Sequence, residues 1–595
     1  MAPASRGGTK QGGLSSDVAT EFVVDTVESM SSPAPAHDTI ERIARERFGW
    51  ESFLPGQSDA IRSAAAGRDT LLVLATGGGK SAVYQVAGAA RGGIVVVVSP
   101  LIALQADQRA SIEAAPDAPD VVAINSSRGA AAVARAWERI DEGGSLYVLL
   151  APEQLADEDN VARLAAQDVS LLVVDEAHCV SSWGHDFRPD YLRLGDVRSA
   201  LGDPPVLAMT ATASKPVRAE IVERLRMQDP DVQVHGVDRP EIRLVVQRHE
   251  SDDDKRAAVI LEARSWTAPG LIYVASRRET EEYAAELTAE GRHVAAYHAG
   301  LKVAERRAVQ DRWRDGELDV VVATSAFGMG IDRGDVRFVL HAATTESLDA
   351  YYQEVGRAGR DGEPATAVLH YRVEDLALRR FFAKRSVDKA ALQDLWRAIK
   401  RKPGASVREL AEAVDRPART VSRLLNQLVD AELVDTADGV QPLRTTRADV
   451  VVRAVKDAVA ARGRIAESRL SMMRAYAEES QCRRRVLLDY FGVDGPEWCG
   501  NCDGCERREA AGDAGVASDA AGAGGPRDAG SGVESAPDAP LSVDELVEHR
   551  EWGPGTVVSV EEDRATIFFE SEGYKVVALA ALDSKVLRQV SEVRG

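Results

Sequence analysis

The sequence lacks any long run of apolar residues. Runs such as Ile94–Val98 are far shorter than the about 20 residues that span a bilayer. The N-terminal residues also lack the apolar core of a secretion signal. We therefore expect a cytoplasmic protein with no membrane partner. The length of 595 residues predicts about four domains at roughly 150 residues each.

An excess of positive charge is also missing. The chain carries 94 acidic and 73 basic side chains, a formal net charge of −21, and only 12 of the basic residues are lysines. This balance excludes nucleic-acid binding through a diffuse positive field, but it leaves binding through local basic and aromatic patches open. We interpret the low lysine content as genomic base composition.

Cysteine is scarce and unevenly distributed. Four of the five cysteines, Cys482, Cys499, Cys502 and Cys505, lie within 24 residues at intervals of 17, 3 and 3. In a chain expected in a reducing compartment, such a cluster favours a metal site over disulfides. The fifth, Cys179, is expected to be a packed structural residue.

Short apolar runs alternate with amphipathic helical stretches over residues 38–387. Continuous apolar strands separated by helices are typical of parallel sheets covered by helices on both faces, an α/β fold. The alternation restarts near residues 236–243, which predicts two lobes, 38–236 and 237–387. The runs are Thr70–Leu74, Ile94–Val98, Leu146–Leu150, Leu171–Val174, Val206–Met209, Leu271–Val274, Val320–Ala323 and Val336–Leu340.

The remaining residues divide into smaller modules. Residues 388–445 combine two short helical patterns with a hairpin signal, which predicts a winged-helix-like segment. Residues 446–506 predict long helices that end at the cysteine cluster. Residues 541–595 predict a small SH3-like β-barrel. The composition of residues 1–37 and 507–540 predicts a disordered tail and a flexible linker.

A glycine-rich loop follows the first apolar run. Backbone N–H groups of such a loop, at the start of a helix, cradle phosphate oxygens. Lys80 can reach the β- and γ-phosphates, and the Ser81 hydroxyl can ligate Mg²⁺, which predicts a site for ATP and Mg²⁺. A plain glycine-rich turn is the alternative. The loop residues are Thr76, Gly77, Gly78, Gly79, Lys80 and Ser81.

Two carboxylates follow the apolar run Leu171–Val174, at the edge where α/β sheets bind ligands. Asp175 can hold Mg²⁺ through water, and Glu176 can orient and deprotonate the attacking water. Arg357 and Arg360 in the second lobe can neutralise charge on the transferred phosphoryl group. A solvated acidic turn and solvated surface arginines are the alternatives.

These motifs resemble RecQ-type DNA helicases of helicase superfamily 2 over about residues 48–507. The resemblance implies two RecA-like lobes that bind ATP, with Trp50, Gln57, Gly330, Asp332 and Gln353 at the nucleotide and Arg360 as the arginine finger. It also implies that Thr210 and Thr212 couple hydrolysis to strand movement. The matching segments are Phe48–Trp50, Pro55–Gln57, Thr76–Ser81, Ser99–Ile102, Asp175–His178, Thr210–Thr212, Tyr297–Gly300, Ala323–Asp332 and Gln353–Arg360.

The segment His178–Pro189 resembles the family's aromatic-rich loop, which senses single-stranded DNA. Trp183 and Phe187 offer stacking faces for bases, and Arg188 can contact a phosphate. Buried core aromatics are the alternative. The resemblance separates the chain from RNA helicases of the same superfamily, which are not expected to carry this loop.

The cysteine spacing matches the family's zinc site, which implies Zn²⁺ held by Cys482, Cys499, Cys502 and Cys505. Four thiolates close a tetrahedral site, so the metal would be structural. An iron–sulfur cluster is the alternative. The adjacent segment Arg483–Arg485 is expected to contact the DNA backbone.

The chain departs from the family after the cysteines, where no room is left for the usual winged-helix and HRDC modules. We hypothesise that residues 388–445 replace the missing strand-separating element, with Arg419, Arg423 and Asn426 facing DNA. A packing insert is the alternative. The C-terminal module resembles the Tudor-like tail of UvrD-type helicases, which implies docking to a protein or nucleic acid. A solubilising appendage is the alternative.

Taken together, the resemblance implies an ATP-dependent DNA helicase that moves 3′ to 5′ and unwinds DNA in repair and recombination. It implies ATP, Mg²⁺ and Zn²⁺ as cofactors and single-stranded and forked DNA as partners. We expect a monomer associated with the nucleoid. A translocase that does not unwind and an ATP-switched DNA-binding adaptor remain open.

Overall fold

The computed structural model describes most of the chain, and residues 34–595 form one compact unit. The predicted tail, Trp183, Phe187, Gly330 and Asp332 lie outside the described residues. The described residues are 37–100, 102–125, 128–181, 188–267, 269–328, 333–383, 387–436, 439–444, 446–519, 541–543, 545–560, 564–570, 572–582 and 586–589.

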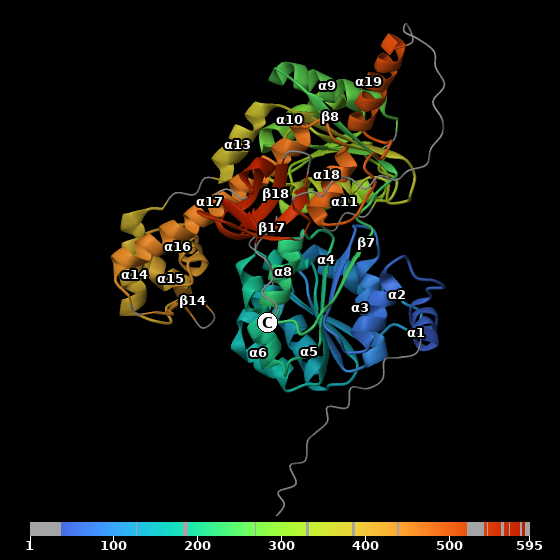
Figure 1. The fold of residues 1–595 in the computed structure, drawn as a ribbon. Helices are drawn as coiled ribbons and strands as arrows, with labels where there is room; N and C mark the ends of the chain where they lie inside the picture. Colours follow the sequence, from blue (N-terminus) through green and yellow to red (C-terminus); the bar gives the residue numbers. More distant parts are fainter. Residues whose placement is uncertain are drawn as a thin grey trace, which may run out of the picture. The chain divides into compact units, whose positions relative to one another are not determined.

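Lobe 1 is built on a seven-stranded, all-parallel sheet in the order β3-β4-β2-β5-β6-β1-β7, with helices on both faces (Figure 1). Its strands are β1 (Thr70–Leu74), β2 (Ile94–Val98), β3 (Val121–Ile124), β4 (Leu146–Leu150), β5 (Val169–Val174), β6 (Val206–Thr210) and β7 (Asp231–His235). Because both faces are covered, Leu71 and Val73 of β1 enter one hydrophobic cluster while Leu72 and Leu74 enter another.

Two helices of lobe 1, α1 and α2, precede the first strand, and the others lie between successive parallel strands. The helices of the lobe are α1 (His37–Phe48), α2 (Gln57–Ala65), α3 (Lys80–Arg91), α4 (Ile102–Glu113), α5 (Ala130–Asp141), α6 (Glu158–Ala165), α7 (Leu194–Ala200) and α8 (Lys215–Arg224). Three short 3₁₀ helices add η1 (Pro152–Ala156), η2 (Ala177–Val180) and η3 (Pro189–Arg193).

Lobe 2 contains a six-stranded parallel sheet in the order β10-β11-β9-β12-β13-β8. Its strands are β8 (Ile242–Arg248), β9 (Gly270–Tyr273), β10 (Val294–Tyr297), β11 (Val320–Ala323), β12 (Phe338–His341) and β13 (Ala365–Tyr371). Its helices are α9 (Asp252–Ser265), α10 (Arg277–Ala289), α11 (Val303–Arg314), α12 (Leu348–Val355) and α13 (Val373–Ala383). The two sheets confirm the predicted pair of α/β lobes.

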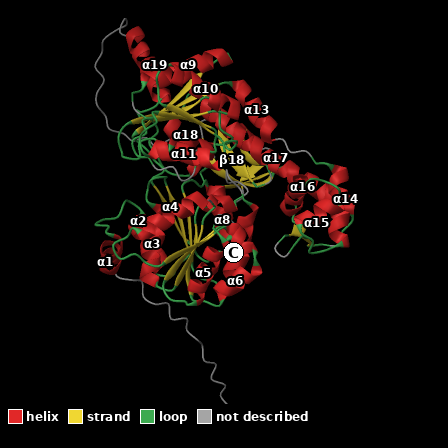
Figure 2. Cartoon of the chain, turned by 180° about the vertical axis from the view of Figure 1, so that it is seen from behind, coloured by secondary structure: helices red, strands yellow, loops and turns green. Residues whose placement is uncertain are grey.

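The segment after lobe 2, which we call the insert, is mostly helical (Figure 2). It contains α14 (Lys389–Arg401), α15 (Val407–Ala413), α16 (Ala418–Asp430) and an antiparallel pair, β14 (Val434–Asp435) and β15 (Gln441–Pro442). Its residues form a separate hydrophobic core around Trp396 and Leu424, which Val451 of the following helix completes. Helices followed by a small hairpin correspond to the predicted winged-helix-like order.

The zinc module starts with α17 (Ala448–Glu478), a 31-residue helix. Its N-terminal half packs in the core of the insert, and its C-terminal half packs in the main core. Two further helices follow, α18 (Arg483–Phe491) and α19 (Asp503–Asp519). The helix α19 extends into the segment predicted as a linker from residue 507, because that segment continues with residues such as Glu509 and Ala510 that a helix accommodates easily.

The C-terminal module is an antiparallel sheet in the order β19-β18-β17-β16-β20. Its elements are β16 (Leu546–His549), β17 (Gly553–Val560), β18 (Arg564–Phe569), β19 (Gly573–Ala578), η4 (Leu579–Ala581) and β20 (Leu587–Gln589). Val558, Phe568 and Tyr574 belong to the main hydrophobic core, so this module is packed against the helicase lobes and the zinc module.

In the part of the chain that the structure describes, every helix is too short or too polar to cross a membrane.

Candidate ATP site and zinc centre

Three neighbouring strands of lobe 1 bring the predicted catalytic residues to one edge of the sheet. The order β5-β6-β1 places the acidic pair after β5, Thr210 at the end of β6 and the phosphate loop after β1. The carboxyl ends of parallel strands share an edge, so motifs more than 130 residues apart in the sequence meet there.

The phosphate loop has the backbone that its glycines permit. Gly77 and Gly79 have positive φ angles of 86° and 72°, which side chains disfavour. Lys80 starts α3, and its Nζ donates a hydrogen bond of 3.1 Å to the Leu74 carbonyl. Burial lowers the pKa of Lys80, whereas the nearby Glu176 and Asp175 raise it.

Gln57 of α2 forms hydrogen bonds to this loop. Its Nε2 donates to the carbonyls of Gly78 and Gly79 at 3.1 and 3.0 Å, and its Oε1 accepts from the Leu54 N–H at 2.8 Å. Trp50 stacks on Phe48 with ring centroids 5.0 Å apart. Gln57 is therefore in contact with the phosphate loop, and Trp50 packs against the core of lobe 1.

Asp175 is buried and held by several donors. The Gln108 amide donates to its Oδ2 at 2.7 Å, and the Glu176 N–H donates to its Oδ1 at 3.0 Å. Burial, followed by the charge of Glu176, raises the pKa of Asp175 to about 6, against the opposing effects of Lys80 and Gln108. The carboxylate is thus present at neutral pH and ready for a cation.

A polar chain links Glu176 to the segment after β6. Glu176 has a left-handed backbone with φ 49°, and its Oε2 lies 3.3 Å from Nδ1 of His178. The same nitrogen lies 2.9 Å from Oγ1 of Thr210, which donates to the Thr212 carbonyl at 3.0 Å. Although burial opposes it, Cys179 and Glu176 raise the pKa of His178 well above its ordinary value.

The two lobes share one cavity of about 820 Å³, large enough for a nucleotide. Lobe 2 contributes Gln353, Arg357 and Arg360, so the phosphate loop, the acidic pair and both predicted arginines face a common space. A Cβ added to Gly77 would lie 3.4 Å from Cγ of Arg360, which shows how closely the lobes approach here. The lining residues are Thr76, Gly77, Gly79, Lys80, Ser81, Leu104, Asp107, Gln108, Ser111, Asp175, Glu176, Arg314, Gly334, Gln353, Arg357, Arg360 and Asp361.

Other predicted residues lie away from this cavity. Gly78 and Trp50 do not line it. The guanidinium of Arg188 donates to the Pro100 carbonyl at 2.9 Å, inside the matched segment Ser99–Ile102.

Sequence reasoning missed Gln108 and Tyr191, which both hold Asp175. Tyr191 in η3 donates to the Asp175 carbonyl at 3.2 Å. Gln108 lies on α4, directly after the matched segment Ser99–Ile102, and that position was the one available signal for it.

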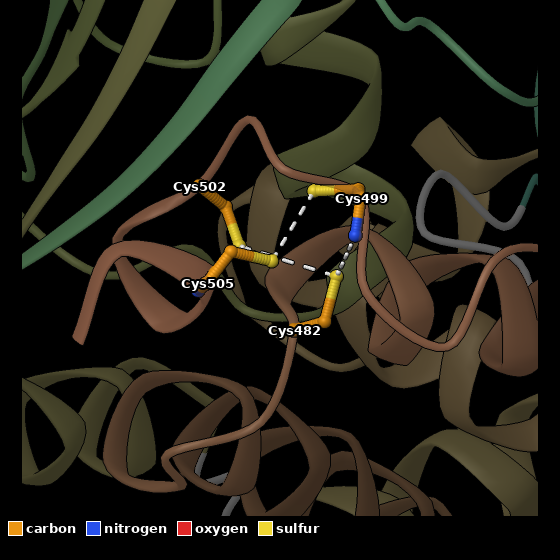
Figure 3. A group of neighbouring side chains, drawn as sticks. All are labelled: Cys482, Cys499, Cys502 and Cys505. Atoms are coloured by element: carbon orange, nitrogen blue, oxygen red, sulfur yellow. Dashed lines mark hydrogen bonds between the residues drawn. The ribbon is translucent and has the colours of Figure 1, made fainter. Parts of the chain in front are cut away.

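The four predicted zinc ligands converge (Figure 3). Their sulfur atoms all lie within 4.8 Å of one another. The shortest separations are 3.5 Å for Cys502–Cys505, 3.9 Å for Cys499–Cys505 and 4.0 Å for Cys482–Cys502. Zn–S bonds of about 2.3 Å in a tetrahedron require sulfurs about 3.8 Å apart, so the cluster fits zinc. Cys179 is buried beside His178, outside this cluster.

Backbone N–H groups point at the sulfurs, as anionic thiolates require. The N–H groups of Arg483 and Cys505 donate to Cys502, and that of Cys499 donates to Cys482, each at 3.4 Å. Such donors favour the deprotonated ligands that a structural metal needs.

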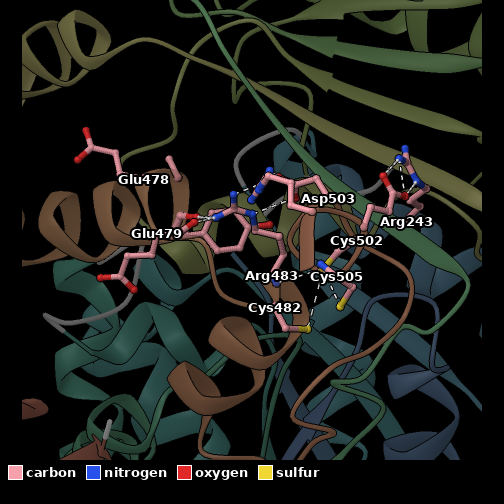
Figure 4. A network of polar contacts seen from close by, with 12 residues as sticks. Arg243, Glu478, Glu479, Cys482, Arg483, Cys502, Asp503 and Cys505 are labelled. Atoms are coloured by element: carbon pink, nitrogen blue, oxygen red, sulfur yellow. Dashed lines mark hydrogen bonds and ion pairs between the residues drawn. The ribbon is translucent and has the colours of Figure 1, made fainter. Parts of the chain in front are cut away.

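The expectation that Arg483–Arg485 contact DNA is wrong for two of the three, of which Figure 4 shows Arg483 beside Asp503. Arg483 is buried and pairs with Asp503 through two bonds of 3.0 Å. Arg484 is buried and donates to the carbonyls of Arg239 and Ile242. The Arg483 guanidinium joins two helices of the zinc module. The Arg484 guanidinium joins the zinc module to lobe 2, because it supplies donors to carbonyls at a loop and at the start of a strand.

The zinc module also continues the edge of the lobe 2 sheet. Leu244 of β8 forms a parallel bridge with Cys502, and its N–H donates to the Asn501 carbonyl at 3.4 Å. Arg243 makes a two-pronged ion pair with Glu506, with the shortest separation 2.8 Å. The metal site therefore stabilises the edge of lobe 2.

The insert exposes the residues predicted to face DNA. Arg419, Arg423 and Asn426 are all exposed on α16. The insert also approaches lobe 1, where Arg193 of η3 lies 3.9 Å from Asp435.

Family profiles match five segments of the chain. They are DEAD/DEAH box helicase (54–220), helicase conserved C-terminal domain (255–362), HVO_A0114 (391–446), RecQ zinc-binding (447–506) and a family of unknown function, DUF3553 (545–585). The zinc-binding match places the cysteine cluster in a known module.

Known relatives match most of the chain. The probable ATP-dependent DNA helicase RecS of Bacillus subtilis is 34% identical over 75% of this chain and 86% of its own. The ATP-dependent DNA helicase RecQ of Pasteurella multocida is 32% identical over 79% of this chain and 63% of its own, so the chain spans less than two thirds of that relative. The solved structure of Mycobacterium smegmatis Lhr with ssDNA and AMP-PNP aligns at 20% identity and a TM-score of 0.46, over 70% of this chain and 60% of that one. The lobes, the zinc-binding match and the identity to RecS together show that the chain belongs to the RecQ family of DNA helicases.

Proposed function

We propose that this chain is an ATP-dependent DNA helicase that moves 3′ to 5′ along single-stranded DNA and unwinds duplex DNA in repair and recombination. One observation carries the proposal: the phosphate loop, the acidic pair and the two lobe 2 arginines line a single cavity. RecS and RecQ, its relatives, are named as ATP-dependent DNA helicases. We also propose that it acts at the nucleoid.

In this proposal, ATP is the substrate and its phosphates lie at the loop. Lys80 neutralises the β- and γ-phosphates, and Ser81 and Asp175 would hold Mg²⁺, which supplies further charge neutralisation. The Glu176 carboxylate accepts a proton from the water that attacks the γ-phosphorus. The bond from phosphorus to the bridging oxygen breaks, and that oxygen leaves with ADP.

The arginines of lobe 2 make hydrolysis depend on the position of both lobes. We assign Arg360 as the finger at the developing charge, because it approaches Gly77 of the phosphate loop. Arg357 is buried beneath it and lines the same cavity. Thr210 and Thr212 would couple hydrolysis at Glu176 to movement of the DNA strand, through the contact of Thr210 with His178.

DNA contacts are assigned to local basic and aromatic patches, because the overall charge is negative. We propose that Trp183, Phe187 and Arg188 contact the single strand. We propose that Arg419 and Arg423 of the insert contact duplex DNA at a fork.

The test is ATP hydrolysis and fork unwinding with and without single-stranded DNA, beside the variants Lys80→Ala and Glu176→Gln. We expect DNA-stimulated hydrolysis and 3′-to-5′ unwinding, both lost in the two variants. Absence of DNA-stimulated hydrolysis in the parent protein would contradict the proposal. Stimulated hydrolysis without unwinding would instead identify a translocase, and DNA binding that changes with ATP but without hydrolysis would identify an adaptor.

A further inference from the structure

We infer that Tyr574 of the C-terminal module is a positioning residue for ATP hydrolysis. Its hydroxyl bonds to Ser214 after Thr212 in lobe 1, its backbone bonds to α17 of the zinc module, and its ring packs on Tyr490, which bonds to α12 of lobe 2. This tie stabilises the arrangement in which both lobes line one cavity, so that bound ATP is in contact with Gln353 of lobe 2 as well as with the phosphate loop. The inference rests on the proposed ATP hydrolysis.

The first contact is at Ser214, two residues after Thr212. Ser214 is the N-cap of α8, where a serine hydroxyl usually accepts from the first turn of its helix, but here it makes no such bond. Instead the Tyr574 hydroxyl donates to its Oγ at 3.1 Å. Both residues are buried, so the hydroxyl pair is shielded from water.

The backbone of Tyr574 is fixed on the opposite side by α17. The Tyr574 N–H donates to Oγ of Ser468 at 2.5 Å, and that hydroxyl donates to the Tyr574 carbonyl at 3.2 Å. An ion pair of 3.0 Å between Arg464 and Glu572 adds a second attachment one turn away. The tyrosine therefore cannot follow lobe 1 without moving against α17.

The ring of Tyr574 continues the connection to lobe 2. It packs on Tyr490 of α18 with centroids 5.4 Å apart, and the Tyr490 hydroxyl donates to Asp349. Asp349 lies on α12, four residues before Gln353 of the ATP cavity. All three side chains are buried.

The two ends of this connection flank the reaction cavity. On one end, Ser214 follows the Thr210–Thr212 segment that contacts His178 and, through it, Glu176. On the other end, α12 leads into the segment that carries Arg357 and Arg360. Loss of the tie would loosen the lobes without removing any group that touches ATP.

The experiment compares ATP hydrolysis by full-length Tyr574→Phe, Ser214→Ala and the double variant, over a range of ATP concentrations at saturating single-stranded DNA. Tyr574→Phe keeps the ring packing and removes only the hydroxyl. We expect the KM for ATP to rise about two- to tenfold, the range that one hydrogen bond contributes, with kcat changed less than twofold. The double variant should equal either single variant, because both remove the same bond.

The matched control is Ser471→Ala. Ser471 also lies on α17, but its exposed hydroxyl bonds only within the helix, to the Glu467 carbonyl. It should leave KM and kcat unchanged. An unchanged KM in Tyr574→Phe overturns the inference, as does an additive effect in the double variant.

Failure of the proposed function is recognised separately. If the parent protein hydrolyses no ATP, the affinity for Mg²⁺·AMP-PNP replaces KM as the readout. A weaker affinity in Tyr574→Phe would then still support the tie, and an unchanged affinity would overturn it. A lower thermal midpoint with unchanged nucleotide parameters shows a purely structural role and also overturns the inference.

Discussion

Arg360 is the residue at which lobe 2 comes nearest to the phosphate loop. Its Cγ would lie 3.4 Å from a Cβ on Gly77, and it lines the common cavity. Because a finger acts on charge that develops in the transition state, Arg360→Ala should lower kcat by about 10³-fold or more and leave nucleotide affinity nearly unchanged. Steady-state hydrolysis and AMP-PNP binding measure the two effects.

The control for this variant is Arg307→Ala, an exposed arginine on α11 outside the cavity. It should behave as the parent protein. A kcat within tenfold of the parent in Arg360→Ala would contradict the assignment of the finger.

Gln108 supports the Asp175 carboxylate, which we propose to hold Mg²⁺. The hydrogen bond that its side-chain amide donates to Asp175 lowers the pKa of that carboxyl. Burial acts in the opposite direction and raises the pKa overall to about 6. In Gln108→Leu the pKa should rise further, so the carboxylate is lost at a higher pH when the medium is acidified. At fixed, subsaturating Mg²⁺, activity at pH 6 should fall roughly three- to tenfold relative to pH 8.

A pH–activity profile beside the parent protein tests this prediction. Ser111→Ala, on the same helix and in the same cavity, serves as the control. If the acidic side of the pH–activity profile stays in place or moves to lower pH in Gln108→Leu, Gln108 does not stabilise the carboxylate.

At the residue scale, the sequence predicts groups whose role depends on near neighbours in the chain. Lys80, Asp175 and Glu176 follow apolar strands directly, so their placement at the sheet edge can be read from local spacing. Gln108 could not be found this way, since its partner is 67 residues away. Arg483 and Arg484 were misassigned because their buried partners belong to α19 and to lobe 2.

At the element scale, the sequence reveals central strands and misses several others. β1, β2 and β4 are fully buried and read as continuous apolar runs. β7 lies at the edge of its sheet, where partial exposure admits polar residues such as Gln233, so no continuous apolar run identifies it. The edge strands β3 and β10 are apolar but only four residues long, and runs this short do not distinguish a strand from a helix segment.

The four clustered cysteines of the zinc module predict a defined metal content. We expect about one zinc per chain, lost together with thermal stability when a strong chelator is added, because four thiolates anchor the starts of α18 and α19. Cys502→Ser should lose most of the zinc, and Cys179→Ser should retain it. Elemental analysis measures the content, and iron or a brown colour would contradict the assignment.

The exposed arginines of the insert predict that DNA binds to the surface of α16. Replacing both Arg419 and Arg423 by Ala should weaken binding to forked DNA and reduce the slope of log K against log salt by about one to two, roughly 0.9 per lost phosphate contact. The control removes two exposed lobe 2 arginines, Arg264 and Arg278. Equal slopes in both double variants would identify the insert as a packing element.

At the scale of the whole molecule, the hydrophobic clusters separate the insert from the rest of the described chain. The second clusters of lobe 1, lobe 2 and the C-terminal module share strands with the cluster that joins these parts, and the cluster of the insert shares none. One cluster joins lobe 1, lobe 2, the zinc module and part of the C-terminal module, while the insert has its own core. We therefore expect two unfolding transitions in denaturant. Trp396, fully buried in the insert, should report one of them, and AMP-PNP should stabilise only the other.

Fluorescence of the parent protein and of Trp396→Phe separates the two transitions, since the variant loses the signal of the insert. Circular dichroism follows the molecule as a whole. A single transition, seen by both probes and shifted by AMP-PNP, would show that the insert and the lobes unfold together.

The length of α17 has a mechanical consequence. Its 31 residues extend about 46 Å, with Val451 near one end in the core shared with the insert and Tyr476 near the other end in the main core. A tilt of about 5° about one end displaces the other by about 4 Å, more than the length of a hydrogen bond. The helix therefore couples the two cores mechanically. In the proposed function, a force that a DNA fork exerts on the insert would be transmitted along α17 to Ser468, which binds Tyr574, so load on the fork would change the affinity for ATP.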